Sequence, residues 1–325
     1  MRAPAFWTAG PSALSTLLMP LGAVYGAVGK LRRMAVSPQQ PPVPVICVGN
    51  LVAGGAGKTP VAQAIARHMI GQGVNVHFLS RGYGGRLKGP VRVVPGIHTA
   101  FDVGDEPLLL AETAPCWVAA NRVAGAKAAA ADGAQIIVMD DGHQNPGLVK
   151  AVSIVVVDGG TGFGNGRIIP AGPLRESVAE GLARADAVVI LGDDKTGVAQ
   201  GLPQGMALLN GHLKPTEESR ALDGERVLAF AGIGRPEKFF DTVRALGCNL
   251  VEQRGFPDHH PYGYKEVREL IDAAWALGAL PVTTAKDAVR LPPDLRAPVM
   301  VVEVEVVWQE PGLLDKVLLA GLRHG

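Results

Sequence analysis

The segment GNLVAGGAGKTP, residues 49–60, constrains the fold of this chain more than any other feature. It follows the apolar run VPVICVGN, which suits a buried strand, and it precedes VAQAIARHMIGQG, whose apolar residues have helical spacing. A glycine-rich loop between a strand and a helix allows backbone N–H groups to converge on phosphate oxygens. An ordinary glycine-rich turn is the alternative, but the Lys-Thr pair at the start of the helix favours a phosphate-binding loop.

The loop departs from the usual pattern at its beginning. That pattern is G-x-x-x-x-G-K-[ST], and the position of its first glycine is held by Val52. Lys58 remains to reach the β- and γ-phosphates, and the hydroxyl of Thr59 remains to bind Mg²⁺. We therefore predict a phosphate-binding set that also contains Gly54, Gly55, Ala56 and Gly57.

The composition is that of a globular protein with a large core. Of the 325 residues, 47% are hydrophobic and 19% are charged, which argues against disorder and suits two domains or one large one. The net charge of +1 gives no indication of a nucleic-acid partner. Cys47, Cys116 and Cys248 lie far apart and form no Cys-x-x-Cys pair, which argues against a zinc site or a disulfide framework.

The N-terminal segment, residues 1–36, is predicted to form a membrane-associating helix. No charged side chain occurs from Ala3 to Gly29, and the basic run KLRR follows. The apolar residues form one helical stripe of Leu14, Leu17, Leu18, Leu21, Val24, Tyr25 and Val28. A stripe that lies in the lipid surface, with the basic residues near anionic headgroups, fits this pattern best. Packing on the protein's own core and a true membrane span, which Pro20 would interrupt, remain as alternatives.

After a proline-rich linker at 37–44, strand-like and helical segments alternate, which predicts an α/β fold. We expect a P-loop NTPase-like parallel sheet with helices on both faces over 37–218 and a second, smaller α/β domain over 219–325. A polar stretch at 210–225 is interpreted as the boundary. The expected strands are 43–49, 74–80, 116–120, 134–141, 152–158 and 186–192, followed by 226–234, 248–256, 280–287 and 298–308.

Several polar residues follow expected strands, at the end of the sheet where such folds bind ligands. AQIIVMDD ends in Asp140 and Asp141, and a carboxylate in this position can hold Mg²⁺, although Asp-Asp-Gly also forms ordinary turns. In SRGYGG the glycines would let Arg81 approach an anion. VGDEP places Asp105 and Glu106 before a helix, where they serve as caps or as a base that activates a hydroxyl.

Two further loops contain candidate residues. FPDHHPYGY contains His259 and His260, and adjacent histidines point apart, so they are a poor metal pair. A histidine that orients a carboxylate is the more plausible role. IIPAGPLRES ends in Arg175 and Glu176, with prolines that restrict the loop. Taken singly, each of these loops is equally consistent with a structural role.

The order of these motifs resembles that of a known enzyme family. VGN…GGAGKTP, SRGYGG, GDEP, DDGHQ, IPAGPLRE, PEKFF, FPDHHPY and AKDAVRL occur in the order seen in the tetraacyldisaccharide 4'-kinases of lipid A synthesis in Gram-negative bacteria. The resemblance covers nearly the whole chain, and in that family the first glycine of the loop is displaced as it is here. It implies transfer of the γ-phosphate of ATP, with Mg²⁺, to the 4'-hydroxyl of a tetraacyldisaccharide 1-phosphate.

The resemblance also implies roles for residues. Thr59 and Asp140 are expected to hold Mg²⁺, with Asp141 and Glu176 as further metal candidates. Asp105 is expected to be the catalytic base, paired with either His259 or His260, and Lys58 is expected to bind the phosphates with Arg81. Two positions depart from the family: His143 stands where the family has Phe, and Ala285 stands where it has Glu.

The resemblance further implies partners and a location. We expect the lipid acceptor and the membrane surface as partners, no nucleic acid, no obligate protein partner, and a peripheral site on the cytoplasmic face of the inner membrane. The alternative is a membrane-associated P-loop ATPase switch, whose signature lysine would stand where this chain has Ala53. A small-molecule kinase or a GTPase-type metallochaperone is the next alternative, although the Cys and His metal ligands that a metallochaperone needs do not appear in the sequence.

Overall fold

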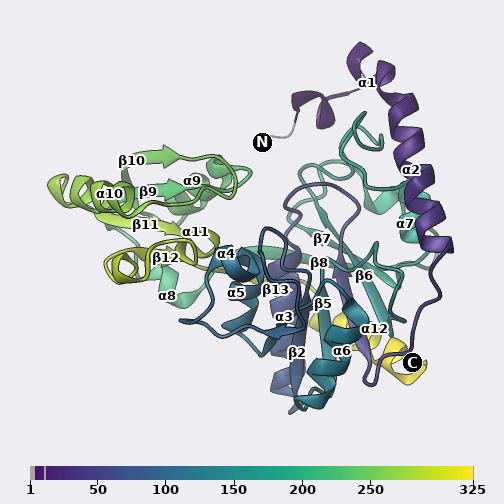
Figure 1. The fold of residues 1–325 in the computed structure, drawn as a ribbon. Coiled ribbons are helices and arrows are strands. Elements are labelled where there is room, and N and C mark those ends of the chain that lie inside the picture. Colours follow the sequence, from purple (N-terminus) through teal and green to yellow (C-terminus); the bar gives the residue numbers. More distant parts are fainter. Residues whose placement is uncertain (1–3, 11, 325) are drawn as a thin grey trace.

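Two β-sheets organise the chain, and Figure 1 shows them beside each other with helices around both. The computed structural model describes residues 4–10 and 12–324. The large sheet has nine strands in the order β13-β8-β7-β6-β1-β5-β2-β4-β3, and the small sheet has four in the order β10-β9-β11-β12. Every neighbouring pair is parallel except β13 with β8 and β3 with β4, at the two edges of the large sheet.

The large sheet contains the expected strands and has helices on both faces, which confirms the α/β P-loop fold class. Its strands are β1 (Val45–Gly49), β2 (Val76–Ser80), β3 (Val91–Arg92), β4 (Cys116–Val118), β5 (Ile136–Asp140), β6 (Val152–Asp158), β7 (Ala187–Leu191), β8 (Ala207–Pro215) and β13 (Val304–Trp308). Its helices are α3 (Lys58–Gly71), α4 (Ala100–Val103), α5 (Asp105–Ala111), α6 (Arg122–Ala131), α7 (Val178–Leu182) and α12 (Pro311–His324), with a short 3-10 turn at Ala199–Gly201.

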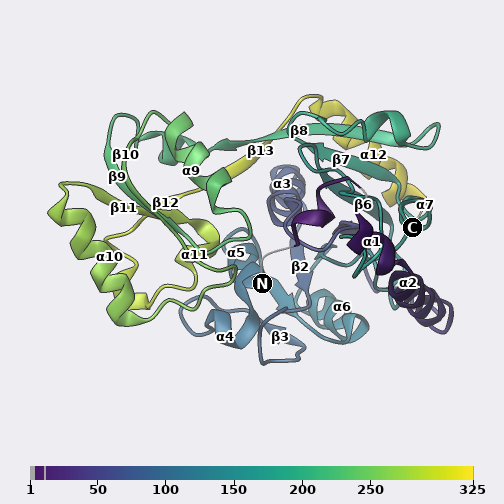
Figure 2. The same ribbon diagram turned by 90° about the horizontal axis from the view of Figure 1, so that it is seen from above.

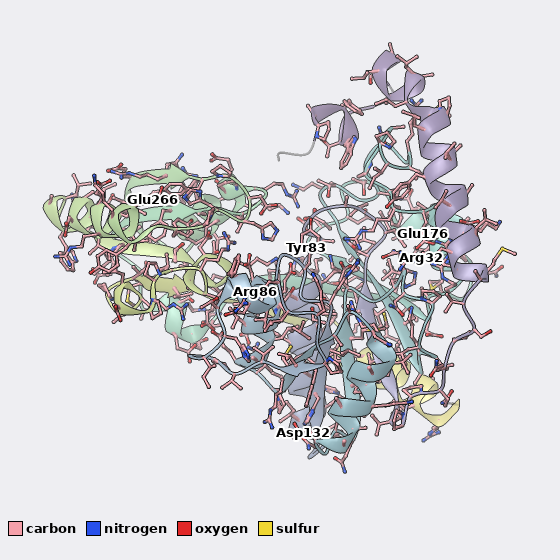
Figure 3. The ribbon with its side chains drawn as sticks, in the orientation of Figure 1. Arg32, Tyr83, Arg86, Asp132, Glu176 and Glu266 are labelled. Atoms are coloured by element: carbon pink, nitrogen blue, oxygen red, sulfur yellow. The ribbon has the colours of Figure 1, made fainter. Side chains whose placement is uncertain are left out.

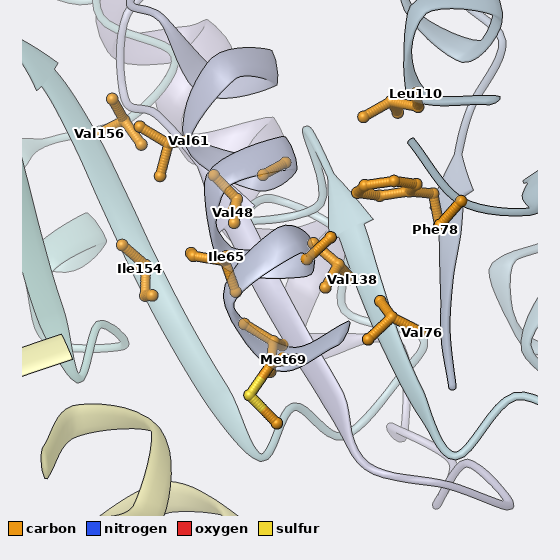
Figure 4. Close-up of a cluster of buried hydrophobic side chains, with 14 of the residues drawn as sticks. Val48, Val61, Ile65, Met69, Val76, Phe78, Leu110, Val138, Ile154 and Val156 are labelled. Atoms are coloured by element: carbon orange, nitrogen blue, oxygen red, sulfur yellow. The ribbon is translucent and has the colours of Figure 1, made fainter. Parts of the chain in front are cut away.

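Alternate side chains of the central strands fill separate cores on the two faces. On one face, α3, α5 and α12 cover residues such as Val48 and Val138. On the other face, α6 covers Met139, while α7 packs over Val155. Figure 4 shows the first core, where one stripe of α3 lies against β1, β5 and β6. This packing fixes the first residue of α3 against the sheet edge, directly after the glycine loop.

The small sheet is entirely parallel and also has helices on both faces. Its strands are β9 (Arg226–Ala231), β10 (Asn249–Gly255), β11 (Leu280–Thr284) and β12 (Met300–Val302). Its helices are α8 (Glu217–Arg220), α9 (Pro236–Ala245), α10 (Tyr264–Ala276) and α11 (Ala285–Ala288), with a 3-10 turn at Pro293–Leu295. Phe240 of α9 lies in the core of one face and Leu270 of α10 in the core of the other.

Three strands near the junction of the two sheets, β8, β12 and β13, differ from the sequence-based expectation. Residues 298–308 form two strands, of which β12 joins the small sheet and β13 joins the large one. The break lies at Glu303, whose backbone N–H and carbonyl both bind the Ser219 hydroxyl. Residues 210–215, expected to be a polar boundary, belong to β8. In Figure 2, β8 and β13 lie at the edge of the large sheet and extend toward the small sheet. A division after residue 218 stays a prediction, and the chain after Glu303 returns to the large sheet.

The N-terminal segment forms a 3-10 turn at Ala5–Trp7 and two helices, α1 (Ala13–Leu17) and α2 (Met19–Met34). The break comes at Leu18, so that Pro20 falls in the first turn of α2, where its missing N–H has no helical partner to lose. Gly22 is buried against Ile168, while the large apolar side chains of these two helices are exposed. The exposed ones are Leu14, Leu17, Met19, Leu21, Val24, Tyr25, Val28, Leu31 and Met34. None of the helices in residues 4–10 and 12–324 has the length and hydropathy needed to cross a membrane.

Candidate active site

The glycine loop ends at Gly57, whose backbone geometry only glycine adopts easily. Its φ is 84°, and a Cβ atom here would collide with the Leu191 side chain. Lys58 and Thr59 are the first two residues of α3, so the unpaired N–H groups of this helix face the loop. Gly54 and Gly55 have open space around them. This arrangement suits an anion that approaches the backbone closely.

Thr59 and Asp140 meet because β1 and β5 are neighbouring parallel strands that end at the same edge of the sheet. Thr59 Oγ1 donates to Asp140 Oδ2 at 3.2 Å. Asp140 is 2% exposed, and its Oδ1 has no hydrogen-bond partner among the described residues. Burial raises the pKa of Asp140 to about 6, against the opposing charge of Lys58. This carboxylate oxygen is therefore available to a cation, and carboxylate oxygens are ligands that Mg²⁺ uses.

Asp141 lies in a turn directly after β5 and has a positive φ of 51°. Its Oδ1 lies 3.6 Å from Lys58 Nζ and accepts a hydrogen bond from Arg175 NH1 at 2.8 Å. Desolvation opposes the charge of Asp141, but Lys58 and Arg175 outweigh it and lower its pKa. The strained turn therefore holds Asp141 beside the phosphate-binding lysine.

Glu176 is 1% exposed, and both of its carboxylate oxygens already have partners. Oε1 accepts from Gln144 Nε2 at 3.0 Å, while Oε2 lies 2.6 Å from Arg184 and 3.3 Å from Arg33. Figure 3 labels Glu176 close to the C-terminal half of α2. This arrangement favours an ion-pair role, so the expectation that Glu176 binds a metal stays a prediction.

A carboxylate from the large sheet and a histidine from the small sheet form a pair. His259 Nδ1 lies 2.8 Å from Asp105 Oδ2, and Arg290 Nε lies 2.9 Å from the same oxygen. Both of these contacts are with Oδ2, and neither involves the second carboxylate oxygen, Oδ1. Burial alone would raise the pKa of Asp105, but His259, Arg290 and Lys286 together lower it. The hydrogen bond to Asp105 raises the pKa of His259, against the effect of burial.

His260 is held elsewhere in the same loop. Its Nε2 lies 2.8 Å from Glu266 Oε2, and its ring stacks on Phe256 with 4.7 Å between the centroids. His259 has a positive φ of 57°, which turns its side chain toward Asp105 and separates it from its neighbour. The structure thus brings His259 into contact with Asp105 and His260 into contact with Glu266, and which histidine takes part in catalysis stays a prediction.

Further cations from the small-sheet part contact acidic residues of the large-sheet part, and sequence analysis assigned these cations no role. Lys286 of α11 forms an ion pair with Glu106 of α5 at 3.1 Å, and Arg290 belongs to the same AKDAVRL motif. Asp158, at the end of β6, binds Arg235 and Lys238 of the small-sheet part, each at 2.6 Å. The signal for these contacts was present in the PEKFF and AKDAVRL motifs, but their partners are distant in sequence.

His143 and Arg81 complete the residues singled out from the sequence. His143 is buried; its Nδ1 lies 3.0 Å from Ser153 Oγ and its Nε2 lies 2.9 Å from the Gly181 carbonyl oxygen, which joins β6 to α7. Burial lowers the pKa of His143 to about 4. Arg81 is exposed and forms no ion pair with the described residues. Its guanidinium is therefore available to an anion.

Residues 14–323 match the family model described as tetraacyldisaccharide-1-P 4'-kinase. The chain is 56% identical to the tetraacyldisaccharide 4'-kinase of Rhodospirillum centenum, with 100% of this chain and 98% of that protein covered. It is 54% identical to that of Rhodospirillum rubrum, with 99% of each covered. A crystal structure of the "apo" form of LpxK from Aquifex aeolicus in complex with ATP superposes with a TM-score of 0.76 and 25% identity, over 95% of this chain and 99% of that one.

Proposed function

The chain belongs to the tetraacyldisaccharide-1-phosphate 4'-kinase family, and on this premise we propose how its residues perform the reaction. The enzyme transfers the γ-phosphate of ATP to the 4'-hydroxyl of the lipid A precursor tetraacyldisaccharide 1-phosphate. The observation that supports this most directly is the match over nearly the whole chain to a family and to relatives of this one activity. The alternative of a membrane-associated ATPase switch is not favoured, because these relatives are kinases.

The triphosphate of ATP is proposed to lie on the glycine loop and the start of α3. Gly54, Gly55, Ala56 and Gly57 provide backbone N–H groups, and Lys58 balances the charge of the β- and γ-phosphates. Arg81 approaches the same phosphates from the loop after β2. In this type of transfer the protein contributes positioning and charge neutralisation more than covalent chemistry.

Mg²⁺ is proposed to bind beside Thr59 and Asp140. In the described part of the chain, no group of three or more His, Cys, Asp or Glu side chains forms a metal site. Mg²⁺ in kinases needs fewer protein ligands, because it uses one or two carboxylates together with substrate phosphates and waters. The unpartnered Oδ1 of Asp140 and the Thr59 hydroxyl fit this need, with Asp141 held next to them. When bound, Mg²⁺ would neutralise charge on the phosphates.

Asp105 is proposed to be the catalytic base, with His259 as its partner. His259 and Arg290 hold one oxygen of Asp105, which leaves Oδ1 to accept the proton of the 4'-hydroxyl. His259 donates a hydrogen bond to the Asp105 carboxylate and stabilises its negative charge before the proton is accepted. Because the pair is divided between the two sheets, it is complete only when they are close together, which limits hydrolysis of ATP without an acceptor.

The exposed stripe of α1 and α2 is proposed to lie in the cytoplasmic surface of the inner membrane. The four acyl chains keep the acceptor in the bilayer, so the enzyme must act at that surface. The apolar side chains face outward and Arg32 is exposed, which supports this orientation. Lys30 and Arg33 are partly neutralised by Glu180 and Glu176, so we expect Arg32 to contribute most of the attraction to anionic lipid.

The function is tested by following label from γ-labelled ATP into the lipid acceptor in mixed micelles. We expect transfer to tetraacyldisaccharide 1-phosphate and none to the same molecule without its 4'-hydroxyl. Turnover of ATP should be slow until the acceptor is added. Rapid ATP hydrolysis at the same rate with and without the acceptor would contradict the kinase function and favour the ATPase switch.

A further inference from the structure

A continuous series of polar contacts connects α2 with the turn that contains Asp141. Arg33 NH1 of α2 lies 3.3 Å from Glu176 Oε2. Glu176 Oε1 accepts a hydrogen bond from Gln144 Nε2 at 3.0 Å. Gln144 Oε1 and Asp141 Oδ1 both accept from Arg175 NH1, at 3.3 Å and 2.8 Å. The series therefore ends at the carboxylate that lies beside Lys58.

Burial makes the first contact of this series energetically important. The Glu176 side chain is 1% exposed, and the Arg33 side chain is 16% exposed. A buried carboxylate needs compensating positive charge, and removal of one partner leaves it partly uncompensated. Glu176 receives that charge from two arginines, Arg184 in the turn after α7 and Arg33 of α2. Full compensation of Glu176 thus requires that α2 lies on the protein as the structure describes it.

The backbone provides a second connection between α2 and the glycine loop. Gly22 of α2 packs directly on the Ile168 carbonyl group, where a Cβ atom would come within 2.8 Å of the oxygen. The segment that follows Ile168 pairs with the glycine loop, since Ala53 donates to the Pro173 carbonyl oxygen at 2.7 Å and Arg175 donates to that of Leu51 at 2.8 Å. The face of α2 opposite its apolar stripe therefore packs on the segment that pairs with the glycine loop.

We propose that Arg33 is a positioning residue for phosphoryl transfer. By compensating Glu176 it keeps Gln144 and Arg175 in place, and these hold Asp141 beside Lys58. The position of α2 on the lipid surface is thereby coupled to the geometry of the nucleotide site. This proposal rests on the proposed kinase function, and it adds a regulation of the same site by the N-terminal helix.

Lys30 provides a matched control on the same helix. It carries the same charge one turn earlier, and its ion pair is with Glu180 at 3.1 Å, while its side chain is 60% exposed. Arg33→Gln and Lys30→Gln each remove one positive charge from α2, so their effects on attraction to anionic lipid should be similar. Of these two residues, Arg33 is the one that contacts Glu176.

The test uses the full chain with the acceptor in vesicles of phosphatidylethanolamine and phosphatidylglycerol. We expect Arg33→Gln to lower kcat about tenfold, which corresponds to about 1.4 kcal/mol in the transition state. Vesicle binding and the KM for the acceptor should match those of Lys30→Gln, whose kcat should equal that of the unaltered protein. Arg33→Lys should recover most of kcat, because it restores the charge near Glu176.

A double substitution distinguishes positioning from loss of folding. Glu176→Gln in the Arg33→Gln background removes the uncompensated carboxylate, so the double variant should lose less kcat than the two single losses multiplied. Unchanged kcat in Arg33→Gln, equal losses in Lys30→Gln, or fully multiplicative losses in the double variant would each overturn the proposal. Absence of acceptor phosphorylation by the unaltered protein would instead overturn the proposed function.

Discussion

His259 Nδ1 lies 2.8 Å from Asp105 Oδ2, although Asp105 begins α5 beside the large sheet, His259 lies in the loop after β10 of the small sheet, and 154 positions separate them in the chain. We predict that Asp105→Ala lowers kcat by about 10²–10⁴-fold, the range typical of a positioned base. His259→Ala should lower kcat less, and the double variant should be no worse than Asp105→Ala, because the two residues act as one unit. His260→Ala is the matched control and should retain most of kcat, since His260 contacts Glu266 instead. Steady-state kinetics of the four variants checks this; multiplicative losses at Asp105 and His259 would argue against the pair.

Lys58 is predicted to be essential for transfer and dispensable for folding. It lies at the first position of α3 and next to Asp141, and we propose that its charge balances that of the phosphates. Lys58→Ala should reduce kcat by about 10²-fold or more, as is usual when a contact to the developing charge is removed. The exposed Lys127 on α6 is a control of equal charge, and Lys127→Ala should be fully active. Near-normal turnover by folded Lys58→Ala would exclude the phosphate-binding role of the loop.

The contact between the two sheets should depend on pH through the same pair. The pKa of His259 is raised in the folded protein, so its contribution to stability is complete below the ordinary histidine value, about 6.5, and is lost as the pH rises through the folded value. The pKa of Asp105 is lowered, so its contribution is present above the ordinary value, about 3.9, and is lost as the pH falls through the folded value. The unaltered protein should therefore exceed His259→Asn in free energy of unfolding by more at pH 6, where His259 is largely protonated, than at about pH 9, where it is neutral. Urea denaturation at both pH values measures it, and a difference that grows toward alkaline pH would contradict the assignment.

The apolar stripe of α2 should determine binding to vesicles. Val24 and Val28 are 63% and 60% exposed, and insertion of such a side chain into lipid is worth about 1.5 kcal/mol or more. Each of Val24→Ser and Val28→Ser should weaken vesicle binding by about tenfold. Ile97 is 73% exposed but lies in a loop near β3, so Ile97→Ser should leave vesicle binding unchanged. Co-sedimentation with anionic vesicles distinguishes these outcomes, and equal effects at all three positions would show that the stripe has no special role.

His143 is predicted to have a structural role, as a link between β6 and α7. His143→Phe would leave the Ser153 hydroxyl and the Gly181 carbonyl oxygen without their partner, at a cost of about 1–3 kcal/mol for each buried unsatisfied group. Ser153→Ala in the same chain should recover part of that loss. Thermal denaturation measures both changes. A variant as stable as the unaltered protein would show that this hydrogen bonding contributes no net stability.

The sequence alone identified the elements whose signal is local. The buried strands are continuous apolar runs, and α3 begins at the Lys-Thr pair because the glycine loop precedes it. The exposure of Leu21 and Val24 and the burial of Gly22 follow from helical spacing in the same way. Residues 298–308 were expected to form one strand, because the sequence of this segment does not indicate that the Glu303 backbone binds the distant Ser219 hydroxyl.

What the sequence determined by itself is the α/β fold, the phosphate-binding loop and the emergence of Asp140 at the end of a buried strand, because each depends on neighbours within a few residues. Only the tertiary structure decided that His259 meets Asp105, that His260 turns to Glu266, and that Glu176 is compensated by Arg33. These contacts join residues that are brought together by the order of strands and by the burial of charge. Strand order and burial of charge depend on the whole chain, so the sequence of any one segment was compatible with several contact partners.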